Sequence, residues 1–153
     1  MGNTPVAETV YRREADHGVF TELYRAAGLE IERGWEDACH PVFSVSARRE
    51  GELLGAATVS RRFERFILDF VAVEPKARML GIGKKLTEAC LRFTAAQGAG
   101  ELWLVARTPG FFRALGARET GGELLLSECL DCPDYRTECE PKEMVLFIEA
   151  SEE

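Results

Sequence analysis

The chain has 153 residues, 46% of them hydrophobic and 29% charged, a length and composition that predict one soluble globular domain over residues 1–153. The net charge of −7 argues against nucleic-acid binding as the main function, because phosphate contacts need a basic surface. No apolar run approaches the roughly 20 residues that span a bilayer, and there is no signal-like N-terminus, so we expect a cytoplasmic protein whose five cysteines are reduced.

The first part of the chain combines one helix pattern with several strand patterns. Asp16 is a suitable N-cap for a helix that continues to about Ala27 and ends at Gly28. Its inner face would carry Phe20, Leu23, Tyr24 and Ala27. Residues 29–40 predict a short second helix that includes Trp35. Strands are expected at 6–13, 42–48 and 53–61, the last two joined as a hairpin by a turn at 50–52.

A strand, a glycine-containing loop and a helix follow in residues 66–97. The apolar run Phe66–Val73 suits a strand buried on both faces of a sheet, and Pro75 ends it. The next loop combines basic residues with Gly81 and Gly83 and leads into a helix with one apolar face. Free amides at a helix start and the helix dipole favour an anion, and glycines allow it to approach closely. The sequence therefore predicts a phosphate-binding loop, with an ordinary strand-to-helix turn as the alternative.

The two familiar nucleotide motifs do not fit this loop. A Walker loop needs glycine at Arg78 and Ser or Thr at Lys85. A dinucleotide fingerprint that begins at Gly81 needs a small residue at Leu86. The loop therefore predicts a phosphate ligand of another kind.

The second half repeats the strand-helix order. Residues 101–106 predict a strand, and Pro109–Leu115 predict a short helix closed by Gly116. Further strands are expected around 124–126 and at 144–148. This order predicts an α/β fold with a mixed sheet.

Three stretches resemble the GNAT superfamily of N-acetyltransferases. V-A-V-E-P at 71–75 and R-M-L-G-I-G at 78–83 resemble its V-x-V-x-P lead-in and its (Q/R)xxGx(G/A) acyl-coenzyme A signature. F-F-R-A-L-G-A-R at 111–118 resembles its FYxxxGF signature, and 104–116 also resembles a stretch of N-acetylglutamate synthase-like members. The resemblance implies a GNAT-like α/β fold: a mixed, mostly antiparallel sheet with splayed central strands, flanked by helices.

The resemblance also implies acetyl-coenzyme A (acetyl-CoA) as the co-substrate, bound along the splayed end of the central strand. Backbone groups of 71–73 would pair with its pantetheine arm, and one amide would polarise the acetyl carbonyl. Amides of 80–84 would hold its pyrophosphate. The implied cofactor-binding residues are Val71, Ala72, Val73, Arg78, Leu80, Gly81, Ile82, Gly83, Lys84 and Phe112.

Asp69 is the candidate catalytic base. It is the only carboxylate inside the apolar run, where burial disfavours the charged form and suits a proton acceptor. Its expected strand face includes Ile67 and Val71, and the alternative is a structural carboxylate bonded to backbone or arginine. In the family a tyrosine of FYxxxGF is the frequent acid; Phe112 stands at that position and has no hydroxyl.

A cysteine cluster is the most distinctive feature outside these motifs. Cys129, Cys132 and Cys139 have a spacing that could bind zinc with Cys39 or His40 as fourth ligand, but a complete second pair is missing. Ordinary or redox-sensitive thiols are therefore favoured, and no metal ligand is assigned.

The favoured function is acetyl transfer from acetyl-CoA to the amine of a small molecule, such as an amino acid, by direct attack in a ternary complex. One alternative is a non-catalytic, CoA-binding sensor that depends on its thiols or a metal; another is a protein lysine or N-terminal acetyltransferase. The expected partner is a small-molecule amine, with neither nucleic acid nor membrane. A homodimer stays open beside a monomer.

Overall fold

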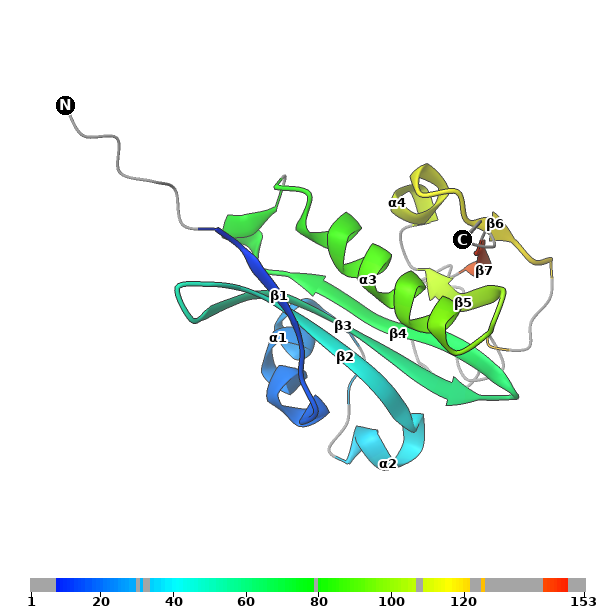
Figure 1. The fold of residues 1–153 in the computed structure, drawn as a ribbon, viewed down its shortest axis with the longest axis horizontal. Coiled ribbons are helices and arrows are strands. Elements are labelled where there is room, and N and C mark those ends of the chain that lie inside the picture. Colours follow the sequence, from blue (N-terminus) through cyan, green and yellow to red (C-terminus); the bar gives the residue numbers. More distant parts are fainter. Residues whose placement is uncertain are drawn as a thin grey trace.

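The computed structural model describes residues 8–29, 31, 34–78, 80–106, 109–121, 125 and 142–148. Within these residues the strands form one seven-stranded sheet in the order β1-β2-β3-β4-β5-β7-β6 (Figure 1). β4 and β5 are parallel, and every other neighbouring pair of these strands is antiparallel. The elements, in which η marks a 3-10 helix, are β1 (Val10–Arg13), η1 (His17–Phe20), α1 (Thr21–Ala26), α2 (Trp35–Cys39), β2 (Pro41–Arg49), β3 (Glu52–Arg62), β4 (Arg65–Val73), η2 (Pro75–Ala77), α3 (Ile82–Ala96), β5 (Glu101–Ala106), α4 (Pro109–Ala114), β6 (Arg118–Glu119) and β7 (Lys142–Phe147).

Helices cover both faces of the sheet (Figure 1). α3 lies on one face and packs on β2, β3 and β4, while α1 and α2 lie on the other. Each face has its own buried cluster: the larger includes Leu68, Leu86 and Leu104, and the smaller includes Tyr24 and Phe70. The apolar run of β4 is therefore buried on both faces, as its sequence predicts.

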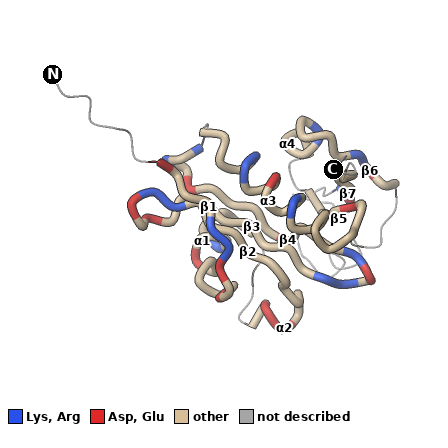
Figure 2. The backbone as a smooth tube through the Cα atoms, in the orientation of Figure 1, with Lys and Arg blue, Asp and Glu red and all other residues tan. Residues whose placement is uncertain are grey.

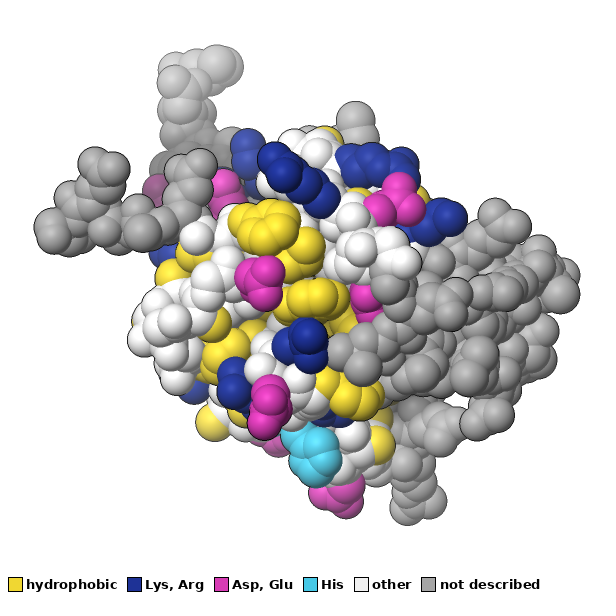
Figure 3. Space-filling model, turned by 90° about the vertical axis from the view of Figure 1, so that its right-hand side faces the viewer, with side chains coloured by type: hydrophobic (Ala, Val, Ile, Leu, Met, Phe, Trp, Pro, Cys, Tyr) yellow, Lys and Arg dark blue, Asp and Glu magenta, His cyan; other side chains and the backbone are white. Residues whose placement is uncertain are grey.

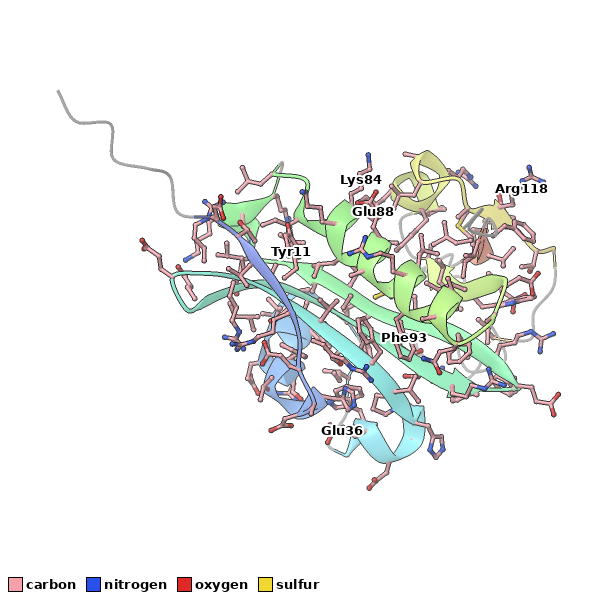
Figure 4. All side chains as sticks on the ribbon, viewed as in Figure 1. Tyr11, Glu36, Lys84, Glu88, Phe93 and Arg118 are labelled. Atoms are coloured by element: carbon pink, nitrogen blue, oxygen red, sulfur yellow. The ribbon has the colours of Figure 1, made fainter. Side chains whose placement is uncertain are left out.

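α3 owes its place to its amphipathic sequence. Its inner residues, such as Leu86 and Cys90, are fully buried. Phe93 lies between the helix and the sheet, where its ring stacks on Phe43 with centroids 4.5 Å apart (Figure 4). Gly55 of β3 lets the helix approach closely, because a Cβ there would stand 3.2 Å from side-chain atoms of α3.

β4 carries an irregularity that divides it in two. Leu68 pairs with Val59 of β3 and Phe70 pairs with Thr58, so Asp69 is an extra residue without a partner in β3. Such a β-bulge reverses the alternation of faces along a strand. Val71 consequently packs on the α3-side core, as Leu68 does, and the expectation that Asp69 shares a face with Val71 is wrong.

β4 and β5 separate just beyond this point. They pair only at Ile67 with Trp103 and at Leu68 with Leu104. The rest of β5 pairs only with β7, up to Ala106 opposite Lys142. The predicted α/β fold, with a mixed, mostly antiparallel sheet and splayed central strands, is confirmed.

Most predicted elements agree with the structure within a few residues, with two corrections. Ala27 is exposed, because α1 ends at Ala26 and Gly28 follows with a φ of +83°. The strand expected around 124–126 is wrong at Leu125, which lies in a turn, and the strand at this edge is β6 instead. No helix in the described residues is long and apolar enough to span a membrane.

Candidate functional site

The loop between β4 and α3 combines a 3-10 turn with a left-handed glycine. η2 follows Glu74, and Gly81 precedes α3 in the left-handed conformation with a φ of +76°. A residue with a side chain rarely adopts this conformation, so the turn requires glycine. Gly81 has no side chain to cap the helix, and a Cβ there would meet no described heavy atom within 4 Å. Without a side-chain cap, the first amides of α3 are available to a ligand at the positive end of a 15-residue helix.

Basic side chains surround this helix start. Figure 2 shows basic residues in the loop before α3 and in its first turn. Arg78 and Lys84 are exposed, and Lys84 projects from the outer side of the helix (Figure 4). The backbone and charge together suit an anionic group such as a pyrophosphate.

The predicted cofactor residues gather around this loop, in different roles. Val71 and Val73 pack on the α3-side core, whereas Ala72 is buried on the α1/α2 side. The Ile82 side chain is buried in the core, so Ile82 can contact a ligand only through its backbone amide. Leu80, by contrast, is about half exposed.

The opening between β4 and β5 lies beside the same loop. Beyond Leu68, β4 has a partner only on its β3 side in the described sheet. The backbone N–H and C=O groups of β4 that face β5 can therefore hydrogen-bond to a ligand that extends along the strand. A long, narrow acyl carrier with a pyrophosphate fits this arrangement, with its phosphates at the start of α3 and its extended arm along β4.

α4, the next element after β5 in the chain, carries two adjacent phenylalanines. Phe111 is 41% exposed and contacts the start of α3, since a Cβ on Gly83 would stand 3.3 Å from its ring. Phe112 is half-buried and packs on the α3-side core. Phe111 is thus the residue that directly adjoins residues 80–84, called the cradle loop below, whereas the family resemblance implies a cofactor contact for Phe112.

Asp69 forms a bidentate ion pair with Arg62. The two Nη atoms of Arg62 donate to its two oxygens at 2.7 and 2.9 Å, and both side chains are only 12% exposed. Arg62 also donates to the carbonyl oxygen of Cys39, at the end of α2. The carboxylate therefore lies on the α1/α2 side of the sheet, and the cradle loop leads into the helix on the other side. The sequence leaves an arginine partner open as the alternative for Asp69, and Arg62, from the preceding strand, is that partner.

A second group of basic residues lies at the other end of β4 and has a packing role. The guanidinium of Arg61 stacks on Phe66 at 4.5 Å from its centroid, and that of Arg65 stacks on Trp103 at 4.6 Å. Figure 3 views this side of the molecule, where hydrophobic side chains are interleaved with basic and acidic ones. These arginines cover aromatic surface at the start of β4 and β5.

A line of hydrogen-bonded side chains crosses the sheet under α1, and the sequence gives no direct sign of it. His17 Nδ1 bonds to Ser44 Oγ at 2.7 Å, Ser44 Oγ to Thr58 Oγ1 at 2.8 Å, and Thr58 Oγ1 to the Tyr24 hydroxyl at 2.7 Å. Burial lowers the pKa of His17 and raises the pKa of Tyr24 above its usual range. A neutral His17 can accept the last hydroxyl proton, so that every hydroxyl in the line has an acceptor. The ring of Tyr24 stacks on Phe70, next to the bulge, with centroids 4.8 Å apart.

The cysteines contribute little to the described site. Cys90 is buried in the core, and burial raises the pKa of its thiol. Cys39 is half-buried at the end of α2. The three remaining cysteines, Cys129, Cys132 and Cys139, lie outside the described residues.

Comparison with known protein families identifies the chain. The profile of the acetyltransferase (GNAT) family matches residues 9–117, which is more than half of the sequence and includes both β4 and the cradle loop. The chain belongs to the GNAT family. It is an acetyl-CoA-dependent N-acetyltransferase, and acetyl-CoA is its co-substrate.

Individual relatives agree with this assignment. An uncharacterised N-acetyltransferase of Chlorobaculum tepidum is 27% identical over 92% of this chain and 97% of its own length. N-acetylglutamate synthase of Neisseria gonorrhoeae, solved with coenzyme A and N-acetyl-glutamate, has a TM-score of 0.71 at 18% identity over 94% of this chain; the match spans about a third of that protein, 36%. The Escherichia coli ribosomal-protein-S18-alanine N-acetyltransferase has a TM-score of 0.71 at 16% identity over 95% of this chain and 97% of its own. At these identities the solved structures show the shared fold.

Proposed function

We propose that this GNAT protein acetylates the amine of a small molecule, with an amino-acid α-amine as the favoured class. The observation that carries the proposal is the position of Asp69 at the bulge beside the opening between β4 and β5. Bulges re-aim side chains and are frequent next to active sites. A thioester in the opening could be reached by an amine from the α1/α2 face, where this carboxylate lies.

The chemistry assigned to the chain's residues is simple. Amides of 80–84 hold the pyrophosphate, and backbone groups of 71–73 align the acyl arm and polarise its carbonyl. The amine nitrogen attacks that carbonyl directly in a ternary complex: a C–N bond forms, the C–S bond breaks, and coenzyme A leaves as a thiolate. Asp69 accepts the proton that the nitrogen loses, and Arg62 fixes the carboxylate for this step. The leaving thiolate takes a proton from solvent, because Phe112 has no hydroxyl to supply one.

The structural neighbours support two kinds of acceptor. One was solved with N-acetyl-glutamate, and another is named for an alanine of a ribosomal protein. A protein N-terminal amine is therefore the second candidate, since it is also an α-amine.

An acceptor screen tests the proposed substrate class. Free L-amino acids, polyamines and short peptides with free N-termini are each incubated with acetyl-CoA and the protein, and released thiol and product mass are measured. We expect acetylation of at least one free amino acid at a rate above that of every peptide. Acetylation of peptides alone would overturn the small-molecule proposal.

Asp69→Asn tests the assigned base, because the amide keeps the shape of the side chain and an oxygen that can accept from Arg62. We expect kcat to fall about a hundredfold or more, as loss of a general base does, with acetyl-CoA affinity within about threefold of wild type. Glu64→Gln is the matched control, since Glu64 is an exposed carboxylate at the tip of the β3–β4 hairpin, and it should be fully active. Equal activity of Asp69→Asn and wild type would remove Asp69 from the mechanism.

A further inference from the structure

A buried serine of β3 has a hydroxyl that the packing of the fold does not use. Ser60 is 0% exposed, and its Oγ has no hydrogen-bond partner among the residues that the structure describes. Three other buried hydroxyl residues on the same face of β2 and β3 do have one: Ser44, Ser46 and Thr58. Since an unsatisfied buried hydroxyl costs free energy, Ser60 calls for an explanation outside the packing of the sheet.

Ser60 lies on the face of the sheet that carries Asp69. Its neighbour Val59 packs in the α3-side core, so the alternation of side chains places Ser60 on the α1/α2 side. Ser60 pairs in register with Ile67 of β4, and Asp69 is the second residue beyond Ile67. Ser60 and Asp69 are therefore diagonal neighbours across the two strands, a relation that places Cα atoms roughly 7–8 Å apart.

The side chain of Arg62 passes the same position. Arg62 is the second residue after Ser60 on β3, and it pairs in register with Arg65 of β4. Its guanidinium nevertheless bonds to Asp69, which lies further along β4 on the far side of Ile67. The Arg62 side chain must therefore run back along the strands past Ser60. The unused hydroxyl thus lies beside the buried ion pair.

The pair of Asp69 with Arg62 suits a carboxylate but not a carboxylic acid. While Asp69 is ionised, its two oxygens accept N–H groups of Arg62. Once Asp69 has taken a proton from the amine, as the proposed function requires, one of these oxygens carries an O–H group. A guanidinium has donors only and cannot accept from it. The Ser60 oxygen has lone pairs that no described group occupies, so it can accept.

We propose that Ser60 is a positioning residue for the proton transfer to Asp69. Rotation about its Cα–Cβ bond brings Oγ to the protonated carboxyl group, whose O–H it accepts. The proton moves from the amine nitrogen to a carboxylate oxygen, is held there by the bond to Ser60, and passes to solvent after the product leaves. This bond forms as the proton arrives, so it stabilises the transition state more than the ground state. The inference rests on the proposed function, which assigns Asp69 as the base.

Two serine variants separate this role from a structural one. Ser60→Ala and Ser46→Ala each remove a hydroxyl that is 0% exposed on the same face of the sheet. The Ser46 hydroxyl donates to the backbone carbonyl of Arg12, so its loss breaks a bond of the folded state. Urea denaturation and initial-rate kinetics, with the best acceptor of the screen, are measured on both full-length variants. The same kinetics are measured on Asp69→Asn with and without Ser60→Ala.

Stability and activity should respond in opposite ways in the two serine variants. Ser60→Ala should have a urea midpoint equal to or above that of wild type, because it removes no hydrogen bond of the folded state. Its kcat should fall about tenfold, with the KM values for the acceptor and acetyl-CoA within about twofold of wild type. Ser46→Ala should have a lower urea midpoint and the kcat of wild type.

The double variant tests whether Ser60 acts through Asp69. An asparagine at this position accepts no proton, so adding Ser60→Ala to Asp69→Asn should change kcat by less than about twofold. The kcat of wild type in Ser60→Ala, or a further tenfold loss in the double variant, would overturn the role of Ser60. Full activity of Asp69→Asn would instead refute the base itself. If no acceptor is acetylated, the proposed function fails, and a urea midpoint of Ser60→Ala as low as that of Ser46→Ala would still overturn the inference.

Discussion

Gly83→Ala should weaken acetyl-CoA binding without lowering the stability of the free protein, because it adds one methyl group within the cradle loop. In a helix, alanine is favoured over glycine by about 0.5–1 kcal/mol. The new Cβ would stand 3.3 Å from the ring of Phe111 and 3.8 Å from Val73. Phe111 is 41% exposed and can move aside in the free protein, so the free energy of unfolding should change by less than about 1 kcal/mol.

When acetyl-CoA is bound along β4, the Phe111 ring has less room to move. The extra methyl group of Gly83→Ala then becomes an overpacked contact that costs about 1–3 kcal/mol of binding free energy. Acetyl-CoA should then bind roughly tenfold to a hundredfold more weakly, as measured by calorimetric titration. Urea denaturation of the same sample gives the free energy of unfolding.

Two glycines serve as references for this experiment. Gly81→Ala should lower the free energy of unfolding by about 1–2 kcal/mol, since its φ of +76° is left-handed. Gly100→Ala, beyond the far end of α3 and with no described heavy atom within 4 Å of its Cβ, should leave acetyl-CoA affinity unchanged. Wild-type affinity in Gly83→Ala, or a loss of stability equal to that of Gly81→Ala, would refute the reasoning.

Two further predictions concern the hydrogen-bonded line under α1. Thr58→Val removes the partner that the buried Tyr24 hydroxyl has among the described residues, and it should lower the free energy of unfolding by about 1–3 kcal/mol. Thr94→Val is the control, because Thr94 is equally buried but bonds to a helix carbonyl, and it should lower the free energy of unfolding by less than about 1 kcal/mol. Equal losses in urea denaturation would count against the hydrogen-bonded line. Burial lowers the pKa of His17, so the unfolded chain binds its proton more readily than the folded one. The stability from neutral His17 is therefore present above pH ~6.5, the ordinary histidine value, and lost as the pH falls through the lower folded value. His17→Asn should flatten this part of the stability profile relative to wild type, and identical profiles would contradict the prediction.

The cofactor side of the site is readable from sequence because its chemistry depends on backbone shape. A glycine before a helix marks a left-handed turn, and Gly81 adopts one. The long apolar run of β4 marks a doubly covered strand, and α3 and α1 cover its two faces. Local sequence is sufficient for both predictions, since neither depends on a distant partner.

The acceptor side depends on contacts that local sequence does not encode. The bulge at Asp69 follows from the register between β3 and β4, and it changes which residues share its face. The partner of Asp69, Arg62, comes from the preceding strand.

The most direct test of the account is residue-resolved amide exchange of the wild-type protein with and without coenzyme A. The ligand is expected to lie along two backbone segments, residues 69–73 of β4 and residues 80–84 at the start of α3. Both should exchange more slowly when coenzyme A is bound, while the buried middle of β2, residues 43–47, should keep its rate. Saturating coenzyme A that leaves both segments unprotected, or protects only the β3–β4 hairpin, would contradict the account.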